Sequence, residues 1–337
     1  MNNSIHFEFS YIDKLYERMG STWLLDFVYL FIISPIGFVG CCLNLFSFFI
    51  LYKIKVKETM LYEYLGFYSL NGSLICFLIS LSFICYSPRY YPYYLSYFSR
   101  INRAFLAPLV STILYFVCNL LDILIALERL SIFVKSLKAF NRLNPYLVCL
   151  SITLLSLIVN MPLFLSYYVK GDDEFYNEIK FNVSTFVYSG RTDYFYSKVG
   201  TIITFVQIII RDILTLLMEL VISSFAFYNL REFNHKLIDM DRISNTFSTN
   251  RREILCKKIL KDRQILLLNS IQTILSLVSH VLVCITYIYG IRGISADLFN
   301  WLCIGYFAIC FKHFSFFFIL CFFNTNFKNK LFNLFSF

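Results

Sequence analysis

The sequence predicts an all-α membrane protein: a bundle of seven transmembrane helices with a C-terminal amphipathic eighth helix. Of its 337 residues, 58% are hydrophobic, 20% are aromatic and only 15% are charged, whereas a typical soluble protein has about 25% charged residues. Apolar stretches long enough to cross a bilayer, which takes roughly 20 residues, occur seven times. The last one is followed by a short segment with one apolar and one basic side.

The predicted spans are joined by short connections, apart from two near 170–198 and 231–263, so no separate soluble domain fits between them. Residues 1–22 form the expected extracellular N-terminus. Residues 324–337 form the amphipathic helix, which suits the inner membrane interface. The seven-helix bundle covers 23–323, with spans at 23–51, 62–86, 104–134, 145–168, 199–229, 264–290 and 297–323.

The distribution of lysine and arginine sets the expected orientation. With the N-terminus outside, the segments on the cytoplasmic side hold 17 of these residues and the outer segments hold ten. Because positively charged loops stay inside, this distribution predicts an extracellular N-terminus. The expected location of the protein is the plasma membrane. The net charge of +9 then belongs mostly to the cytoplasmic surface, and nucleic acid is not an expected partner. The glycosylation sequons at Asn2 and Asn182 both fall outside.

Several charged residues lie within the predicted spans, where a charge costs a few kcal/mol or more unless it finds a partner. Asp122 and the adjacent pair Glu128–Arg129 lie in the third span. Lys312 of the seventh span has a similar depth to Asp122 and is its expected ion-pair partner. The fifth span adds three charges that cannot all face lipid: Arg211, Asp212 and Glu219.

Together these features resemble the rhodopsin-like G-protein-coupled receptor family, and within it the divergent invertebrate orphan and FMRFamide-type neuropeptide receptors. Asn44 resembles the family's first-helix asparagine, and Asn71 occupies the site of its second-helix aspartate. Glu128-Arg129-Leu130 resembles the Asp/Glu-Arg-Tyr motif. The pattern Asn-x-x-Phe-Lys at 324–328 resembles the start of the family's eighth helix, so the resemblance covers nearly the whole chain.

The resemblance implies a receptor that converts an extracellular ligand, with a small neuropeptide favoured, into activation of a heterotrimeric G protein. It implies that Glu128 holds Arg129 at rest and that an outward swing of the sixth helix releases it. The family also holds a sodium ion between its second, third and seventh helices; here Lys312, paired with Asp122, is expected to replace that ion. The basic cytoplasmic extension of the sixth helix would meet the G protein, or anionic lipid, through Lys257, Lys258 and Lys261.

The sequence also departs from this family. Residues 316–320 read Phe-Phe-Phe-Ile-Leu where the family has Asn-Pro-x-x-Tyr, and the sixth and seventh spans contain no proline. The fourth and sixth spans contain no tryptophan. Ala104 stands at the site of the third-helix disulfide cysteine, and the 170–198 connection has no cysteine to pair with one. These departures concern the activation switch more than the fold.

Ligand-binding residues can be assigned only by depth. Ser111 replaces the aspartate of amine receptors, so a monoamine is not expected. Lys312 lies about two residues too close to the Asn-x-x-Phe pattern to carry retinal, so no cofactor is expected. The candidates for ligand contact are Arg103, Ser111, Tyr115, His280 and Tyr287.

Two other functions compete with a receptor. A proton-coupled or ion transporter would use the intramembrane charges, but the odd number of spans and the lack of internal repeats weigh against it. A membrane enzyme is less favoured, because no HExxH or nucleophile–base motif is present. The span histidines, His280 and His313, are interpreted as packing or cavity residues, and no metal site is expected.

Overall fold

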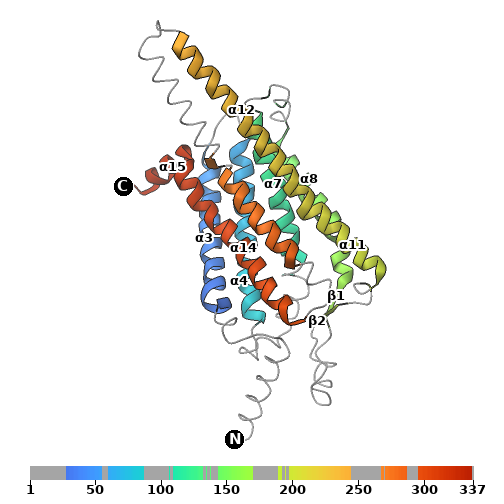
Figure 1. Ribbon diagram of the computed structural model, residues 1–337. Helices are drawn as coiled ribbons and strands as arrows, with labels where there is room; N and C mark the ends of the chain where they lie inside the picture. Colours follow the sequence, from blue (N-terminus) through green and yellow to red (C-terminus); the bar gives the residue numbers. More distant parts are fainter. Residues whose placement is uncertain are drawn as a thin grey trace, which may run out of the picture.

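Figure 1 shows the computed structural model, in which long helices lie side by side in one bundle. It describes residues 28–54, 60–86, 109–131, 143–169, 189–191, 197–243, 267–268, 270–286 and 295–335, with the single residues 106, 134, 137 and 194. The expected N-terminal segment 1–22 lies outside this part of the chain.

The described residues form seven successive helical segments and an eighth helix, in the order that the sequence predicts. The first four are η1–α3 (Tyr29–Ile33, π-helical, and Ser34–Tyr52), α4 (Leu61–Tyr86), α7 (Ser111–Leu130) and α8–η5 (Pro145–Asn160 and Met161–Ser166, the latter a 3₁₀ helix). The fifth is α11–η6–α12 (Lys198–Ile208, Ile209–Leu214 as a π-helix, and Thr215–Ile243). The sixth helix covers Ser270–Thr286, followed by α14 (Ser295–Phe323) and α15 (Thr325–Phe335).

Side chains are distributed as a lipid environment requires. Four helical stretches are long and apolar enough to cross a membrane: Leu30–Tyr52, Leu61–Leu81, Pro145–Leu165 and Ile304–Phe323. Large apolar side chains such as Ile158 and Val221 point outwards and are 71% and 66% exposed, while Asn44 and Asp212 are completely buried. Polar groups therefore gather inside the bundle, because lipid offers them no hydrogen-bond partners.

The first two helices pack closely, because small residues of the first helix face the second. A Cβ atom at Gly37 would lie 3.0 Å from the Cys76 carbonyl oxygen of α4, so a larger residue would force the two helices slightly apart. Nearby, the hydroxyl of Ser80 donates to the Ser34 carbonyl at 2.8 Å, and that of Ser34 donates to the Ser80 carbonyl at 3.1 Å. Small residues and hydroxyls are typical of helix contacts in membranes.

Several helix boundaries differ from those expected. The third helix ends at Leu130 instead of 134. The fifth helix continues to Ile243, so residues 231–243, predicted as part of a connection, are helical. This tail carries apolar residues at helical spacing, which explains the continuation. The fourth span ends at Ser166 instead of 168, and Tyr167–Val169 pairs as strand β1 with β2 (Ser189–Arg191) in an antiparallel hairpin. Tyr and Val favour strands, and here this local preference ends the helix before the apolar stretch ends.

The eighth helix begins at a capped turn. The side-chain oxygen of Asn324 accepts a hydrogen bond from the backbone N–H of Phe327 at 3.0 Å, and the Phe327 side chain is completely buried. Tyr62 of α4 contacts this turn, because its hydroxyl accepts a hydrogen bond from the Asn326 amide at 2.8 Å. The Asn-x-x-Phe pattern therefore acts as a helix cap with a buried anchor.

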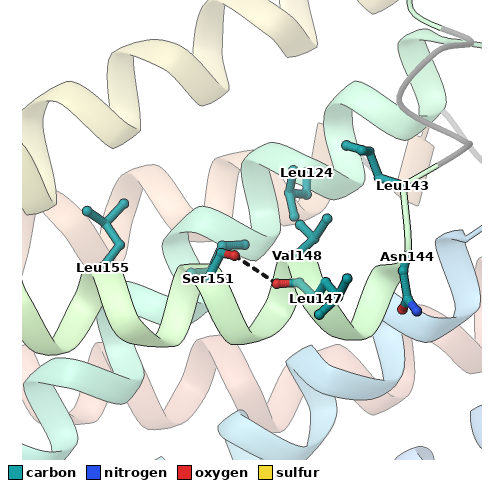
Figure 2. A pocket seen from close by; sticks show the side chains of 8 residues that line it. Leu124, Leu143, Asn144, Leu147, Val148, Ser151 and Leu155 are labelled. Atoms are coloured by element: carbon teal, nitrogen blue, oxygen red, sulfur yellow. Dashed lines mark hydrogen bonds between the residues drawn. The ribbon is translucent and has the colours of Figure 1, made fainter.

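An apolar groove of about 390 Å³ lies between α7 and α8 (Figure 2). Two of its polar atoms already have partners: the Asn144 side-chain oxygen accepts from the Tyr146 N–H, and the Ser151 hydroxyl donates to the Leu147 carbonyl. Leu147 is 62% exposed on this side of the bundle. The groove is thus part of the lipid-facing surface and offers little to a polar ligand.

Candidate functional site: a polar core inside the bundle

An ion pair links the third and seventh helices in the middle of the bundle. The Lys312 ammonium of α14 lies 2.8 Å from the Asp122 carboxylate of α7, and the two side chains are 1% exposed. This is the pair that the sequence predicts from depth. A buried ion pair is tolerated only where further hydrogen bonds satisfy both partners.

The sixth helix supplies those further hydrogen bonds. The Gln272 amide donates to the second oxygen of Asp122 at 2.5 Å, and the Lys312 ammonium donates to the Ser276 hydroxyl at 2.9 Å. Gln272 and Ser276 are one helical turn apart and therefore present the same face. The third, sixth and seventh helices thus meet at one charged point.

Aromatic rings and a further acid surround the ion pair. The Lys312 nitrogen lies 5.9 Å from the ring centre of Tyr68 and 5.8 Å from that of Tyr115, within the range of a cation–π interaction. Glu219 of α12 is 3% exposed, and its carboxyl group lies near the hydroxyls of Thr273 and Ser276. The second, third, fifth, sixth and seventh helices all contribute to this polar core.

A second contact joins the first, second and seventh helices. The Asn44 amide donates to the carbonyls of Gly40 and His313, both at 2.8 Å. Gly72 of α4 faces this contact, because a Cβ there would lie 2.7 Å from the His313 ring and 3.4 Å from the Asn44 side-chain oxygen. Asn71 is half-buried instead, and its amide donates to the Phe67 carbonyl of its own helix. The second-helix contribution to the core therefore comes from Tyr68 and Gly72 rather than from Asn71.

The fifth helix neutralises its own charges where it widens into a π-helical turn. Arg211 and Asp212 of η6 are 2% and 0% exposed, and the guanidinium holds the carboxylate through two nitrogens, at 2.6 and 3.0 Å. The Thr215 hydroxyl donates to the Arg211 carbonyl. His280 of the sixth helix contacts the Asp212 carbonyl through its Nδ1 atom at 3.3 Å. π-turns of this kind often occur at functional sites.

The Glu128–Arg129 pair is buried at the far end of α7, with side chains 6% and 4% exposed. The Glu128 carboxylate accepts a hydrogen bond from the Met60 backbone N–H at 3.2 Å, at the start of α4. The acid thus ties the third helix to the second. That Glu128 holds Arg129 at rest remains a prediction.

The candidate ligand residues fall into two groups. Tyr115 and His280 come together, with ring centres 5.5 Å apart, and the Tyr115 hydroxyl lies 3.1 Å from that of Ser279. Ser111 is buried one helical turn before Tyr115. The other predicted site residues lie outside the described part of the chain: Arg103, Tyr287, Lys257, Lys258, Lys261, Asn2 and Asn182. Within the described ranges, no three His, Cys, Asp or Glu residues gather as a metal site would require.

Sequence reasoning missed the sixth-helix residues of the core, although a signal was present. Gln272, Ser276 and Ser279 follow the spacing i, i+4, i+7 in a mostly apolar helix, which predicts one polar face towards the bundle interior. Tyr68 and Gly72 had no comparable signal, because aromatic and small residues are frequent throughout α4.

No protein-family model matches this sequence, and no curated protein matches it. The structure is similar to the crystal structure of squid rhodopsin, with a TM-score of 0.67 over 94% of this chain and 86% of that chain, at 12% sequence identity. An identity this low carries information about the fold alone. The chain therefore has the seven-transmembrane fold of rhodopsin, with a short helix after the seventh span.

Proposed function

We propose that the protein is a G-protein-coupled receptor that transmits the binding of an extracellular ligand to a heterotrimeric G protein. The observation that carries the proposal is the buried Glu128–Arg129 pair at the end of α7, within a rhodopsin-like bundle. The tail of α12 projects beyond the bundle at the end where α15 lies (Figure 1). Arg129, this tail and the basic segment with Lys257, Lys258 and Lys261 would form the G-protein surface.

The pairing of intramembrane charges supports a receptor over a transporter. Asp122 is held by Lys312, and Asp212 is held by Arg211. A transporter would use such charges to bind and release its ion or proton. Here the Asp122–Lys312 pair joins two helices, and Arg211 and Asp212 neutralise each other within one helix. Both pairs therefore support the structure.

The ligand we favour is a small peptide, entering at the Ser111 end of α7. Tyr115, Ser279 and His280 lie together there, beside the Arg211–Asp212 pair. This combination of aromatic, hydroxyl and charged groups suits a peptide, which offers both apolar side chains and backbone hydrogen-bond groups. Arg103 and Tyr287 would extend the same site. The chain would lie in the plasma membrane with its N-terminus outside.

The test is second-messenger output in cells that express the wild type or Arg129→Ala, challenged with a mixed neuropeptide library. We expect a response in the wild type that is lost in Arg129→Ala at equal surface expression. Lys198→Ala is the matched control: it also removes one positive charge, but at the exposed start of α11, at the other end of the bundle. It should respond like the wild type. An unchanged response in Arg129→Ala would contradict the proposed role of this residue.

A further inference from the structure

The sixth helix is bound to the Asp122–Lys312 ion pair at both of its charges. Gln272 donates to the anion and Ser276 accepts from the cation. Both contacts are buried, since Gln272 is 4% exposed and Ser276 is completely buried. The sixth helix cannot move away from α7 and α14 without giving up both hydrogen bonds.

We propose that Asp122, Lys312, Gln272 and Ser276 form a four-residue latch that holds the sixth helix against the third and seventh helices. Hydrogen bonds to charged groups are stronger than neutral ones, and each is worth about tenfold or more in an equilibrium. Because the latch contacts both members of one ion pair, it closes only while that pair is intact. A ligand that displaced Lys312 from Asp122 would release the sixth helix as well.

The arrangement couples Tyr115 to the latch. Tyr115 contacts Lys312 through its ring and Ser279 through its hydroxyl, and Ser279 lies three residues after Ser276 on the sixth helix. A change at Tyr115 thus reaches both the cation and the helix that the latch holds. The regulatory part of this inference, control of signalling by the latch, rests on the proposed receptor function; the conformational part does not.

The test separates the latch from the ion pair itself by removing only the sixth-helix contacts. The variant Gln272→Leu/Ser276→Ala keeps Asp122 and Lys312. Spin labels at Leu147 of α8 and at Leu267, three residues before the start of the sixth helix, are 62% and 47% exposed and report the distance between α8 and that end of the sixth helix. The purified full-length chain in lipid nanodiscs is used, after its accessible native cysteines have been replaced by serine.

We expect a population of molecules with a longer distance between the labels in the double variant. This population should be at least tenfold larger than in the wild type. The matched control is Gln207→Leu/Ser47→Ala, which makes the same two changes at buried sites whose hydrogen bonds, to Val159 and Leu43, do not involve the sixth helix. It should keep the wild-type distance. A wild-type distance in Gln272→Leu/Ser276→Ala, or an equal lengthening in the control, overturns the latch.

If the double variant does not fold, Ser276→Ala alone removes the hydrogen bond to Lys312, together with the contact between the Ser276 hydroxyl and Glu219. A smaller population with a longer distance is expected from it, and the absence of that population overturns the latch. Ligand-free second-messenger output of the same variants separates the two proposals. A longer distance with raised basal output supports both. A longer distance with no output at normal surface expression supports the latch and contradicts the receptor function.

Discussion

The Lys312 ammonium lies 2.8 Å from the Asp122 carboxylate, 190 residues away in the sequence, and neither group reaches the surface. We expect Asp122→Asn or Lys312→Met to destabilise the protein by about 3–5 kcal/mol, because each leaves one buried charge without its partner. The double variant should lose less free energy of unfolding than the two single variants lose together. Thermal unfolding of the purified proteins in one detergent measures this.

The opposite pattern of stabilities would show that Asp122 and Lys312 do not stabilise each other. If Asp122→Asn and Lys312→Met each unfold like the wild type while only the double variant is damaged, the ion pair contributes no mutual stabilisation. Asn71→Ala serves as the control for a polar side chain of the spans that bonds only within its own helix, to Phe67.

Sodium should have no specific effect on this protein. In the receptor family that it resembles, a sodium ion lies between the second, third and seventh helices. Here the ammonium group of Lys312 already neutralises the Asp122 carboxylate. We expect the melting temperature to be the same in sodium chloride and choline chloride at equal ionic strength. Lys312→Met frees the carboxylate, so a stabilisation by sodium that appears only in this variant would agree with the replacement. A sodium-specific stabilisation of the wild type would contradict it.

Replacement of Gly72 by any larger residue is expected to destabilise the protein, because the His313 ring occupies the space of a side chain. A Cβ at Gly72 would lie 2.7 Å from the ring nitrogen, and the ring is fully buried with Asn44 and Tyr68 beside it. We expect Gly72→Ala to cost about 1–3 kcal/mol through overpacking. The measurement is again the unfolding temperature in detergent.

Another glycine of the same helix is the matched control. At Gly66 the nearest atom to an added Cβ, in the Phe48 ring, lies 3.8 Å away, which is an ordinary contact. Gly66→Ala should therefore be neutral or stabilising, since alanine favours a helix more than glycine does. In Gly72→Ala, the further change His313→Ala should recover part of the loss. Equal behaviour of the two glycine variants would contradict the steric explanation.

The fold was largely predictable because each span had to be apolar along its length, and the pairing of Asp122 with Lys312 followed from depth and charge. The position of Asn71 was harder. Neighbouring residues of a helix point about 100° apart. An alignment of the motif that is wrong by one residue therefore selects the wrong face of the helix. In α4 it is Gly72, not Asn71, that faces Asn44. The continuation of α12 to Ile243 was missed because hydropathy marks the edge of the membrane, whereas a helix can continue into water.

The orientation of the bundle can be decided by glycosylation. The excess of Lys and Arg on one side predicts that the N-terminus lies outside, so the sequons at Asn2 and Asn182 are both expected to carry glycans. We expect Asn2→Gln and Asn182→Gln each to shift the protein on a gel by one glycan, and the double variant to match the enzymatically deglycosylated wild type. Asn71→Gln is the control, because its sequon lies within α4 and should not be used. If both variants migrate like the wild type, and an antibody tag inserted in 244–250 is accessible on intact cells, the orientation is reversed. Arg129 would then face the outside, where no G protein could reach it, so this measurement also tests the proposed function.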